Sequence, residues 1–159
     1  MIVFDTHEGR FNYRVAGVCI HEEHVLLQQV AADDFWALPG GRPEFGEHSR
    51  AALEREMREE IGEGVGVGPL FWVLENFLTY DDRVFHEVAF HYEMTLPPAS
   101  SLLDLEREYA GIEPATSLVF RWFPVNRLSQ IRLYPTVLRE ALRDVPAATQ
   151  HLIHRDEPA

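Results

Sequence analysis

A glycine- and acid-rich stretch at residues 41–63 constrains the fold of this chain more than any other segment. Its second half predicts a helix over residues 50–61, because Ser49 is a suitable N-cap, the interior holds neither Gly nor Pro, and Gly62 follows as a stop. At about 100° per residue, one stripe of this helix is apolar and consists of Leu53, Met57 and Ile61. We therefore expect one face of the helix to pack against a core.

Three glutamates fall together on the neighbouring stripe of the helix: Glu56, Glu59 and Glu60. Like charges three and four positions apart repel one another and raise one another's pKa. Two interpretations are open at this point. In the first, Arg55 and Arg58 neutralise the acids on a solvated, salt-bridged surface. In the second, the carboxylates hold a divalent cation such as Mg²⁺, which takes oxygen ligands and bridges carboxylates to phosphate oxygens.

The whole stretch resembles the Nudix box, G-x5-E-x7-R-E-U-x-E-E-x-G-U, in which U is a bulky aliphatic residue. Eight of its nine fixed positions are in register, and these are Gly41, Glu47, Arg55, Glu56, Met57, Glu59, Glu60 and Gly62. The ninth departs, because Glu63 stands where the family has an aliphatic residue. We expect this change to loosen packing at the end of the helix and not to remove a ligand. A match of this length is far more specific than a lone glycine-rich motif.

The resemblance implies metal-dependent chemistry on a diphosphate. The metal ligands that it implies are Glu56, Glu59 and Glu60, together with the backbone carbonyl of Gly40. It also implies catalytic roles for Glu56 and Glu60 and for the pair Arg55 and Glu47. That pair either orients a ligating carboxylate or only ties the loop to the helix, and both alternatives stay open. Mg²⁺ is the expected ion, with Mn²⁺ as the alternative.

Residues beside the box are candidates for substrate binding. Arg42 directly follows the glycines and is expected, with Gly41, to contact a phosphate. Tyr80 stands 17 residues after the box, a spacing that resembles the diadenosine polyphosphate hydrolases of the family, although a lone Tyr at a strand end is usually a packing residue. Five aromatic residues either stack on a base or belong to the core: Phe35, Trp36, Phe71, Trp72 and Phe77.

The general base is open, because members of the family use different residues for it. The alternatives are a helix carboxylate or a glutamate of the connection at residues 97–117, where Glu106 and Glu108 are preferred to Asp104 and Glu113. For each acid of the connection taken alone, a solvated side chain is the favoured interpretation. A similar choice holds for Glu87 and Glu93, whose strand face either lines a pocket or meets water.

The rest of the chain predicts strands and a second helix around this motif. Residues 11–20 and 25–30 are apolar and joined by a polar tetrapeptide, which favours a β-hairpin. Residues 70–80 and 84–96 predict a second pair of strands around a turn at 81–83, and the latter strand alternates as if half-buried. The remaining segments are expected to be a weakly ordered arm (1–10), a long connection (97–117), a strand (118–123), a helix (135–143) and a polar tail (145–159).

This order of elements is typical of an α/β protein in which helices cover a mixed sheet. It fits the Nudix-type α/β/α sandwich, with a mixed β-sheet between helices. The resemblance extends over residues 11–128, although only the box is diagnostic. We expect one Nudix hydrolase domain over residues 1–159, with a core at about 11–145 and flexible ends.

Composition and charge exclude several classes of partner. The formal net charge is −12 and all 14 basic residues are Arg, which argues against polymeric nucleic acid and anionic membranes as partners.

Cys19 is the single cysteine, so neither an intrachain disulfide nor a thiolate zinc site is expected. His21 and His24 are three positions apart in an expected hairpin turn, unlike the H-E-x-x-H spacing of zinc enzymes. The chain shows no signal peptide and no apolar run long enough for a membrane span, so we expect a cytoplasmic protein, with a homodimer left open.

The leading functional hypothesis is metal-dependent hydrolysis of a diphosphate linkage in a nucleoside diphosphate linked to another moiety. Nucleoside triphosphates, dinucleoside polyphosphates and nucleotide sugars all belong to this class of small-molecule substrate. Two alternatives are a noncatalytic nucleotide-sensing domain and an activity like that of isoprenoid-diphosphate isomerases. The intact Glu56, Glu59 and Glu60 argue against the first, and the lack of a further cysteine argues against the second.

Overall fold

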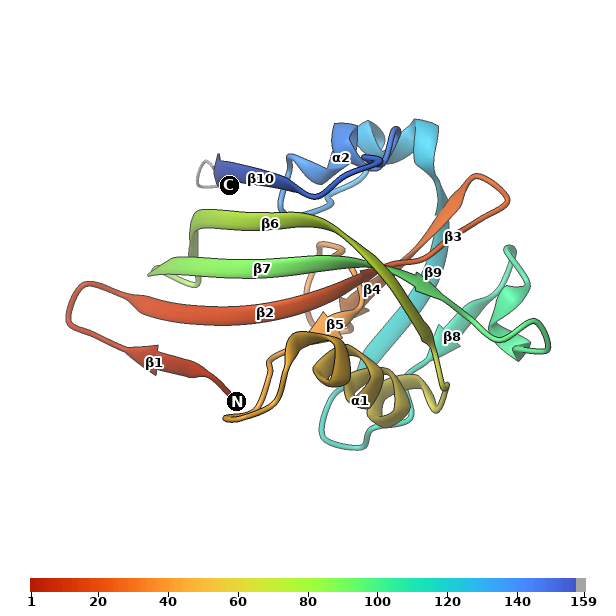
Figure 1. The fold of residues 1–159 in the computed structure, drawn as a ribbon, viewed down its shortest axis with the longest axis horizontal. Helices are drawn as coiled ribbons and strands as arrows, with labels where there is room; N and C mark the ends of the chain where they lie inside the picture. Colours follow the sequence, from red (N-terminus) through yellow and green to blue (C-terminus); the bar gives the residue numbers. More distant parts are fainter. Residues whose placement is uncertain (157–159) are drawn as a thin grey trace.

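Two β-sheets form the framework of the computed structural model, which describes residues 1–156 (Figure 1). The first sheet has the strand order β1 (Val3–Asp5), β2 (Arg10–Val18), β7 (Arg83–Thr95), β6 (Gly66–Tyr80) and β10 (Gln150–Arg155), and β5 (Gly40–Gly41) also pairs with β2. The pairs β2/β7 and β6/β10 are parallel, whereas the other pairs are antiparallel. This is the mixed sheet that the order of elements predicted.

The second sheet is antiparallel throughout. Its order is β3 (Ile20–His21), β4 (His24–Val30), β9 (Leu118–Pro124) and β8 (Glu108–Ala110). The turn between β3 and β4 is confirmed, and its residues Glu22 and Glu23 adopt left-handed conformations with φ of 46° and 62°. Asp81 and Asp82 form a similar left-handed turn between β6 and β7, also as predicted.

The predicted hairpin of residues 11–20 with 25–30 is wrong in one respect. The chain leaves the first sheet at Cys19, so β2 pairs in parallel with β7, and only the two residues of β3 pair with β4. The apolar run around Cys19 is buried on both faces, and a continuous apolar run carries no sign of the point where a strand changes sheet.

Helix α1 (Ser49–Ile61) is confirmed, but its predicted N-cap is not. His48 is the N-cap, and its side chain accepts a hydrogen bond from the Ala51 amide at 3.3 Å. The Ser49 hydroxyl is buried instead against Tyr92, with 2.6 Å between the two oxygens. Gly62 ends the helix as predicted, with a left-handed φ of 75°.

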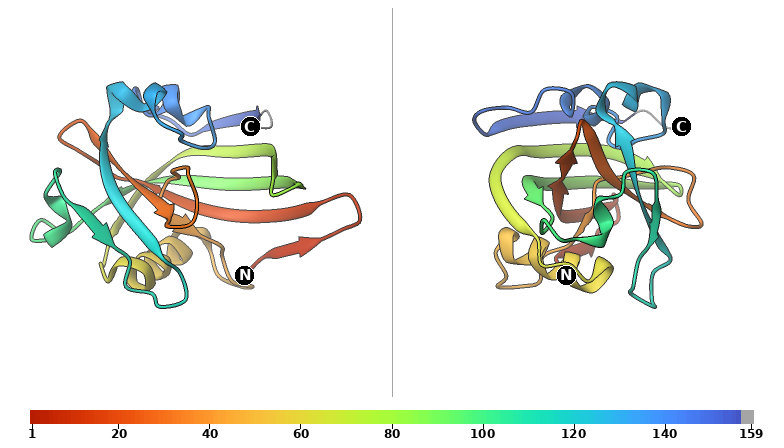
Figure 2. Two further views of the ribbon diagram at one scale, coloured as in Figure 1. Left: turned by 180° about the vertical axis from the view of Figure 1, so that it is seen from behind. Right: turned by 90° about the vertical axis from the view of Figure 1, so that its right-hand side faces the viewer.

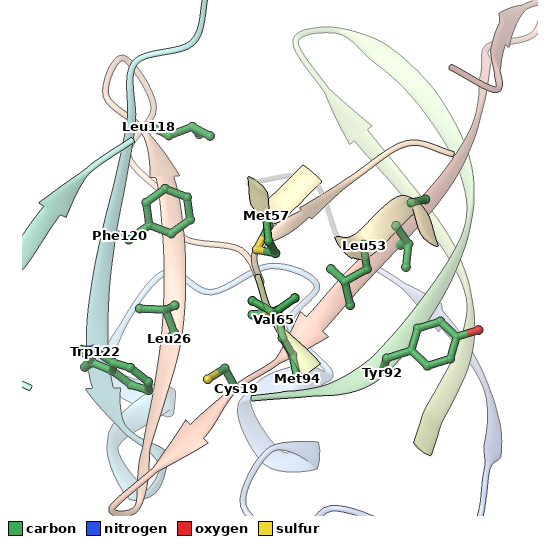
Figure 3. Packing of buried hydrophobic residues seen from close by; sticks show 12 residues of the cluster. Cys19, Leu26, Leu53, Met57, Val65, Tyr92, Met94, Leu118, Phe120 and Trp122 are labelled. Carbon is green, nitrogen blue, oxygen red and sulfur yellow. The ribbon is translucent and has the colours of Figure 1, made fainter. Parts of the chain in front are cut away.

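The apolar stripe of α1 packs into a core between the two sheets, as Figure 3 shows. Leu53 and Met57 are fully buried there, and they lie among side chains of both sheets: Val15, Leu26, Tyr92, Met94, Phe120 and Trp122. Truncating one such aliphatic side chain to Ala costs about 2–5 kcal/mol. Cys19 belongs to the same cluster, and burial raises the pKa of its thiol to about 12.

A second core lies on the opposite face of β2. Ala16 and Val18, which alternate with Val15 on that strand, pack there with residues of the C-terminal part of the chain: Leu128, Leu133, Leu138 and Leu142. Helix α2 (Leu138–Ala141) contributes to this cluster, and α1 and α2 therefore lie on opposite sides of the molecule (Figures 1 and 2). The arrangement confirms the α/β fold class with a mixed sheet between helices.

Two further expectations, the helix at 135–143 and the connection at 97–117, need correction. The predicted helix at 135–143 is only a single α-helical turn. The amides of Leu138 and Arg139 donate to the carbonyls three residues earlier, so residues 135–139 form a tighter turn than an α-helix. The connection at 97–117 contains the 3-10 helix η1 (Ser101–Leu103) and β8, and a second 3-10 helix, η2 (Val125–Gln130), follows β9.

Both ends of the chain also form strands where the sequence predicted none. The arm at 1–10 contains β1, and the tail at 145–159 contains β10 up to Arg155, while the last three residues lie outside the described part. Both strands are short and largely exposed, so they carry too little apolar patterning to stand out in the sequence. Within residues 1–156, no helix has the length and apolar character that crossing a bilayer requires.

Candidate active site

The three glutamates of α1 occupy different environments. Glu59 is half exposed, Glu56 is largely buried, and Glu60 is only 7% exposed. Burial raises the pKa of Glu60 to about 8, and the negative charge of Glu56 is the second cause. The Oε2 atom of Glu60 is buried and has no hydrogen-bond partner among the described residues. A carboxylate in such a position needs either a proton or a cation.

Arg55 joins the box loop to the acids of the helix. Its Nε and Nη2 donate to the two carboxylate oxygens of Glu47 at 2.9 and 3.0 Å, in a bidentate pair. Its Nη1 donates to Glu56 at 3.0 Å and to Glu59 at 3.1 Å. The hydrogen bond between Arg55 and Glu47 lowers the pKa of Glu47 and raises that of Arg55. Arg55 therefore both ties the loop to the helix and holds two of the acids in place.

Gly40 and Gly41, at the start of the box, must be glycines because neighbouring atoms lie very close to them. A Cβ on Gly41 would lie 2.2 Å from the carboxyl carbon of Glu56, and a Cβ on Gly40 would lie 2.0 Å from the carbonyl oxygen of Val15. Only glycine fits these positions without a shift of neighbours. The backbone of β5 is thus pressed directly against the acidic face of α1.

The donor set fits a hard divalent cation in chemistry. Glu60 offers a buried oxygen without a partner, Glu56 lies one helical turn away, and the absent Cβ of Gly41 leaves room around that second carboxylate. Glu56 and Glu59 are both engaged with Arg55, and nowhere in residues 1–156 do three or more His, Cys, Asp or Glu side chains form a group that would hold a metal ion as they stand. The ligand roles of Glu56, Glu59, Glu60 and the Gly40 carbonyl therefore stay a prediction.

A pocket of about 710 Å³ lies near this acidic face, because its lining residues Arg14 and Arg42 act electrostatically on Glu60 and Glu56, and these arginines make its near end cationic. Arg14 and Arg42 line it, and neither forms an ion pair with a carboxylate in the described part of the chain. The Arg42 guanidinium donates to Asn12, whose amide donates to Glu87, and Arg14 donates to the Leu38 carbonyl at 2.8 Å. Burial lowers the pKa of Arg42, and the charge of Arg14 adds to this effect. Two half-buried guanidiniums in a chain of net charge −12 favour an anionic ligand.

The far end of the pocket, beside the turn between β6 and β7, is aromatic. Phe35 makes edge-to-face contacts with Tyr80 and Tyr134, each with 5.7 Å between ring centroids. The Tyr80 hydroxyl donates to Asp33 at 3.0 Å, and this hydrogen bond raises the pKa of Tyr80. Three buried polar side chains line the same pocket, each with one oxygen that has no partner among the described residues: Gln28, Asn76 and Asp156.

The structure brings most of the predicted site residues into one region. Arg42 and Tyr80 line the pocket, whereas Gly41 packs against Glu56. Glu106 and Glu108 are exposed and do not line the pocket. The residue of the long connection whose charge acts on Glu60 is Glu113, and the Ile112 amide donates to the Glu60 carbonyl at 2.7 Å.

Several pocket residues escape sequence reasoning: Asn12, Arg14, Gln28, Asn76 and Asp156. Four of them interrupt strands that read as apolar or alternating, and a polar residue inside such a strand is the one signal that pointed to them. Of the two acids on one face of β7, Glu87 lines the pocket and Glu93 is not among its lining residues. Of the aromatic residues considered for stacking, Phe35 alone appears in the pocket lining, and Trp36, Phe71 and Trp72 pack in the second core.

Comparison with known proteins agrees with this geometry. The family model described as NUDIX domain matches residues 12–145. The solution structure of the E. coli ORF135 protein is similar at 25% sequence identity and a TM-score of 0.51, over 80% of this chain and 84% of that one. A structure of an ADP-ribose pyrophosphatase from Streptococcus suis gives 17% identity and a TM-score of 0.57, over 89% of this chain and 98% of that one.

A third structure, of a UDP-X diphosphatase, has 18% identity and a TM-score of 0.61, over 89% of this chain and 66% of that one. At such identities these two enzymes show likeness of fold alone. A comparison with curated proteins gave no match. The family model spans the box and both arginines at the cationic end. The chain therefore belongs to the Nudix family of hydrolases.

Proposed function

We propose that the protein hydrolyses a diphosphate linkage in a nucleoside diphosphate joined to another moiety. The cationic end of the pocket lies beside the acidic face of α1, so a bound diphosphate has both positive side chains and carboxylate oxygens next to it. The names of two proteins of similar fold, a UDP-X diphosphatase and an ADP-ribose pyrophosphatase, support the same class of substrate.

The observation that carries the proposal is the buried, unpartnered Oε2 atom of Glu60. Glu56, Glu59 and Glu60, with the carbonyl of Gly40, would hold a divalent cation there, with Mg²⁺ preferred and Mn²⁺ as the alternative. When bound, such an ion lowers the pKa of water and neutralises charge on phosphate oxygens. Without an ion or a proton, a carboxylate buried to this degree would destabilise the fold.

The side chains around the helix have separate roles in this proposal. Arg14 and Arg42 bind the phosphate groups, because both guanidiniums line the pocket without a carboxylate partner. Arg55, held by both oxygens of Glu47, fixes the position of Glu56. The general base stays a prediction between a helix carboxylate and the exposed acids Glu106 and Glu108.

A panel of nucleoside triphosphates, dinucleoside polyphosphates and nucleotide sugars, assayed for phosphate products with Mg²⁺, tests the proposal. We expect at least one member to be hydrolysed, and Glu60→Gln to lower kcat by at least about 10²-fold. Glu54→Gln is the matched control, because Glu54 lies on the same helix and forms no ion pair within residues 1–156. Nucleotide binding without turnover of any compound would support the sensing alternative and contradict a hydrolase.

A further inference from the structure

The charges that line the pocket change sign beyond the two arginines of its near end. The acids of the lining are Asp33, Asp34, Glu87 and Asp156. Asp34 forms an ion pair with Arg132. Asp156 is buried, and its Oδ1 lies 3.0 Å from Nε2 of His154. Glu87 and Asp33 are half-buried and form no ion pair within residues 1–156, so each presents an uncompensated carboxylate to the pocket.

Glu87 is connected to Arg42 through a single neutral side chain. The Asn12 amide on β2 donates to Oε2 of Glu87, which is its register partner on β7, and the Asn12 carbonyl oxygen accepts from Nε of Arg42. Asn12 is only 5% exposed, so this chain of hydrogen bonds is fixed in the pocket wall. Burial and two neighbouring arginines lower the pKa of Arg42, whereas the charge of Glu87 raises it, as expected for two charges that lie close together.

The intervening amide leaves both charges available to a ligand. In a direct ion pair, Arg42 would use its donors on the Glu87 carboxylate. Instead Nε of Arg42 donates to Asn12, and no carboxylate accepts from its Nη atoms within residues 1–156. Oε1 of Glu87 accepts no hydrogen bond from those residues either. A phosphate can therefore bind Arg42 while a negative charge remains beside it.

A carboxylate beside a phosphate site discriminates between classes of nucleotide. The terminal phosphate of a nucleoside triphosphate carries about 1.5 to 2 negative charges at pH 7, and a nearby carboxylate repels it. In a sugar-linked diphosphate, hydroxyl groups take the place of that phosphate, and a hydroxyl donates a hydrogen bond to a carboxylate. The unpaired Asp33 extends the same preference toward the aromatic end of the pocket.

We propose that Glu87 is a specificity-determining residue, which selects substrates whose diphosphate is joined to an uncharged, hydroxyl-bearing group such as a sugar and disfavours nucleoside triphosphates. The inference rests on the proposed function in taking Arg14 and Arg42 to bind a diphosphate. It narrows the three classes of compound in the nucleotide panel to the nucleotide sugars.

Calorimetric binding of non-hydrolysable analogues to the full chain with Mg²⁺ tests this proposal without turnover. α,β-Methylene-ADP-ribose and α,β-methylene-ATP share their nucleoside and linkage and differ in the group attached to the second phosphate. The corresponding analogues of UDP-glucose and UTP repeat the comparison with another base. The wild-type protein is expected to bind the sugar-linked member of a pair about tenfold or more tightly than the triphosphate.

Glu87→Gln should reduce this preference at least about fivefold, because the amide keeps the shape of the side chain and removes its charge. Triphosphate binding should become tighter in this variant, whereas the sugar-linked analogue should bind no better than before. Glu93→Gln is the matched control, because it removes the same charge from the same strand outside the pocket lining. Its preference should stay within about twofold of wild type.

Tighter binding of the triphosphate analogues by the wild type would overturn the proposal. An equal change for both members of a pair in Glu87→Gln would make Glu87 a structural support of Arg42 and overturn it as well. If Glu87→Gln does not melt cooperatively, the wild type alone decides. Its preference should fall about threefold or more between about 50 and 500 mM NaCl, and a preference independent of salt would contradict selection by charge.

The same measurements separate this inference from the proposed activity. A preference for sugar-linked analogues without hydrolysis of any compound in the panel would sink the activity and leave the role of Glu87 standing. Hydrolysis of a nucleotide by a protein that prefers triphosphates would do the reverse.

Discussion

The two ends of the pocket are built in contrasting ways. The end beside α1 comes from one contiguous stretch, in which Gly41, Glu47, Arg55 and Glu56 contact one another across a loop and a helix. The rest of the pocket draws residues from β4, β6 and β7 and from segments between strands, and Asp156 joins them just after β10. Chemistry that needs a fixed local geometry is therefore encoded locally, whereas the surface that meets the rest of the substrate depends on how the sheets assemble.

The largest expected effect comes from removing the residue that holds the near end together. Arg55→Ala should lower kcat/KM by about 10²- to 10³-fold, because Glu47, Glu56 and Glu59 all lose their ion pair. Steady-state kinetics on a substrate found with the nucleotide panel measures this. Arg58→Ala serves as control, because Arg58 is exposed on the same helix and forms no ion pair in the described residues. Activity within about threefold of wild type for Arg55→Ala would show that the near end does not act as a unit.

Two glycine substitutions sharpen the comparison inside the near end. Gly41→Ala should lower kcat by about 10- to 100-fold with little change in melting temperature, because the three atoms nearest to the new Cβ all belong to the movable carboxyl group of Glu56. Gly40→Ala should cost about 2 kcal/mol of stability, because its Cβ meets the backbone of Val15. Thermal melts and kinetics on both variants separate the two effects, and equal melting temperatures for the two variants would contradict the contrast.

A stability measurement addresses the sheet that supports both ends. His91 on β7 is 3% exposed, and burial lowers its pKa to about 3. Because the unfolded chain binds a proton near pH 6.5 and the folded chain does not, this contribution is complete above about pH 6.5 and is lost as pH falls towards 3. We expect urea unfolding to show a loss of about 2 kcal/mol from this group between about pH 8 and pH 5.

The variant His91→Leu isolates that contribution. It should unfold with a pH dependence that is smaller than that of wild type by about the same 2 kcal/mol, since Leu does not titrate. Identical pH profiles for the two proteins would show that His91 is protonated as readily in the folded state as in the unfolded one.

The smallest expected effect belongs to the far end. Tyr80→Phe removes only the hydrogen bond to Asp33 and keeps the ring contacts with Phe35 and Phe85. KM should rise about two- to threefold with kcat unchanged. Tyr109→Phe, which removes a hydroxyl outside the pocket, is the control. A large fall in kcat for Tyr80→Phe would place this residue closer to the chemistry than the geometry allows.

The contrast between local and long-range contacts explains which structural features the sequence predicted and which it did not. The helix, its apolar stripe and the turns at Glu22 and Asp81 follow from residues a few positions apart, and the contact of Arg55 with Glu47 and Glu56 lies inside the box that carried the resemblance. The change of sheet at Cys19 and the strands β1 and β10 did not follow. Each depends on a partner strand far away in the chain, and short exposed strands carry little periodicity of their own.

The pocket residues Gln28 and Asn76 show why much of the pocket stayed hidden. Each lies in a strand next to a second polar residue, Gln29 or Glu75, and nothing in the order of residues reveals that Gln28 and Asn76 line the same cavity. The N-cap of α1 is a smaller example of the same effect. The Ser49 hydroxyl is hydrogen-bonded to the distant Tyr92, and His48 caps the helix instead.

The parallel pairing of β10 with β6 also has a consequence for association between chains. β6 spans Gly66–Tyr80 and is hydrogen-bonded to β7 on one side. Without β10, its other side would expose unpaired amides and carbonyls over residues 72–77, and strands of other molecules could pair with this open sheet edge. β10 covers that edge and is itself a six-residue strand with the side chains of His151, His154 and Arg155. A short, charged outer strand of this kind discourages edge-to-edge aggregation, so the C-terminal segment protects the molecule from self-adhesion along this sheet.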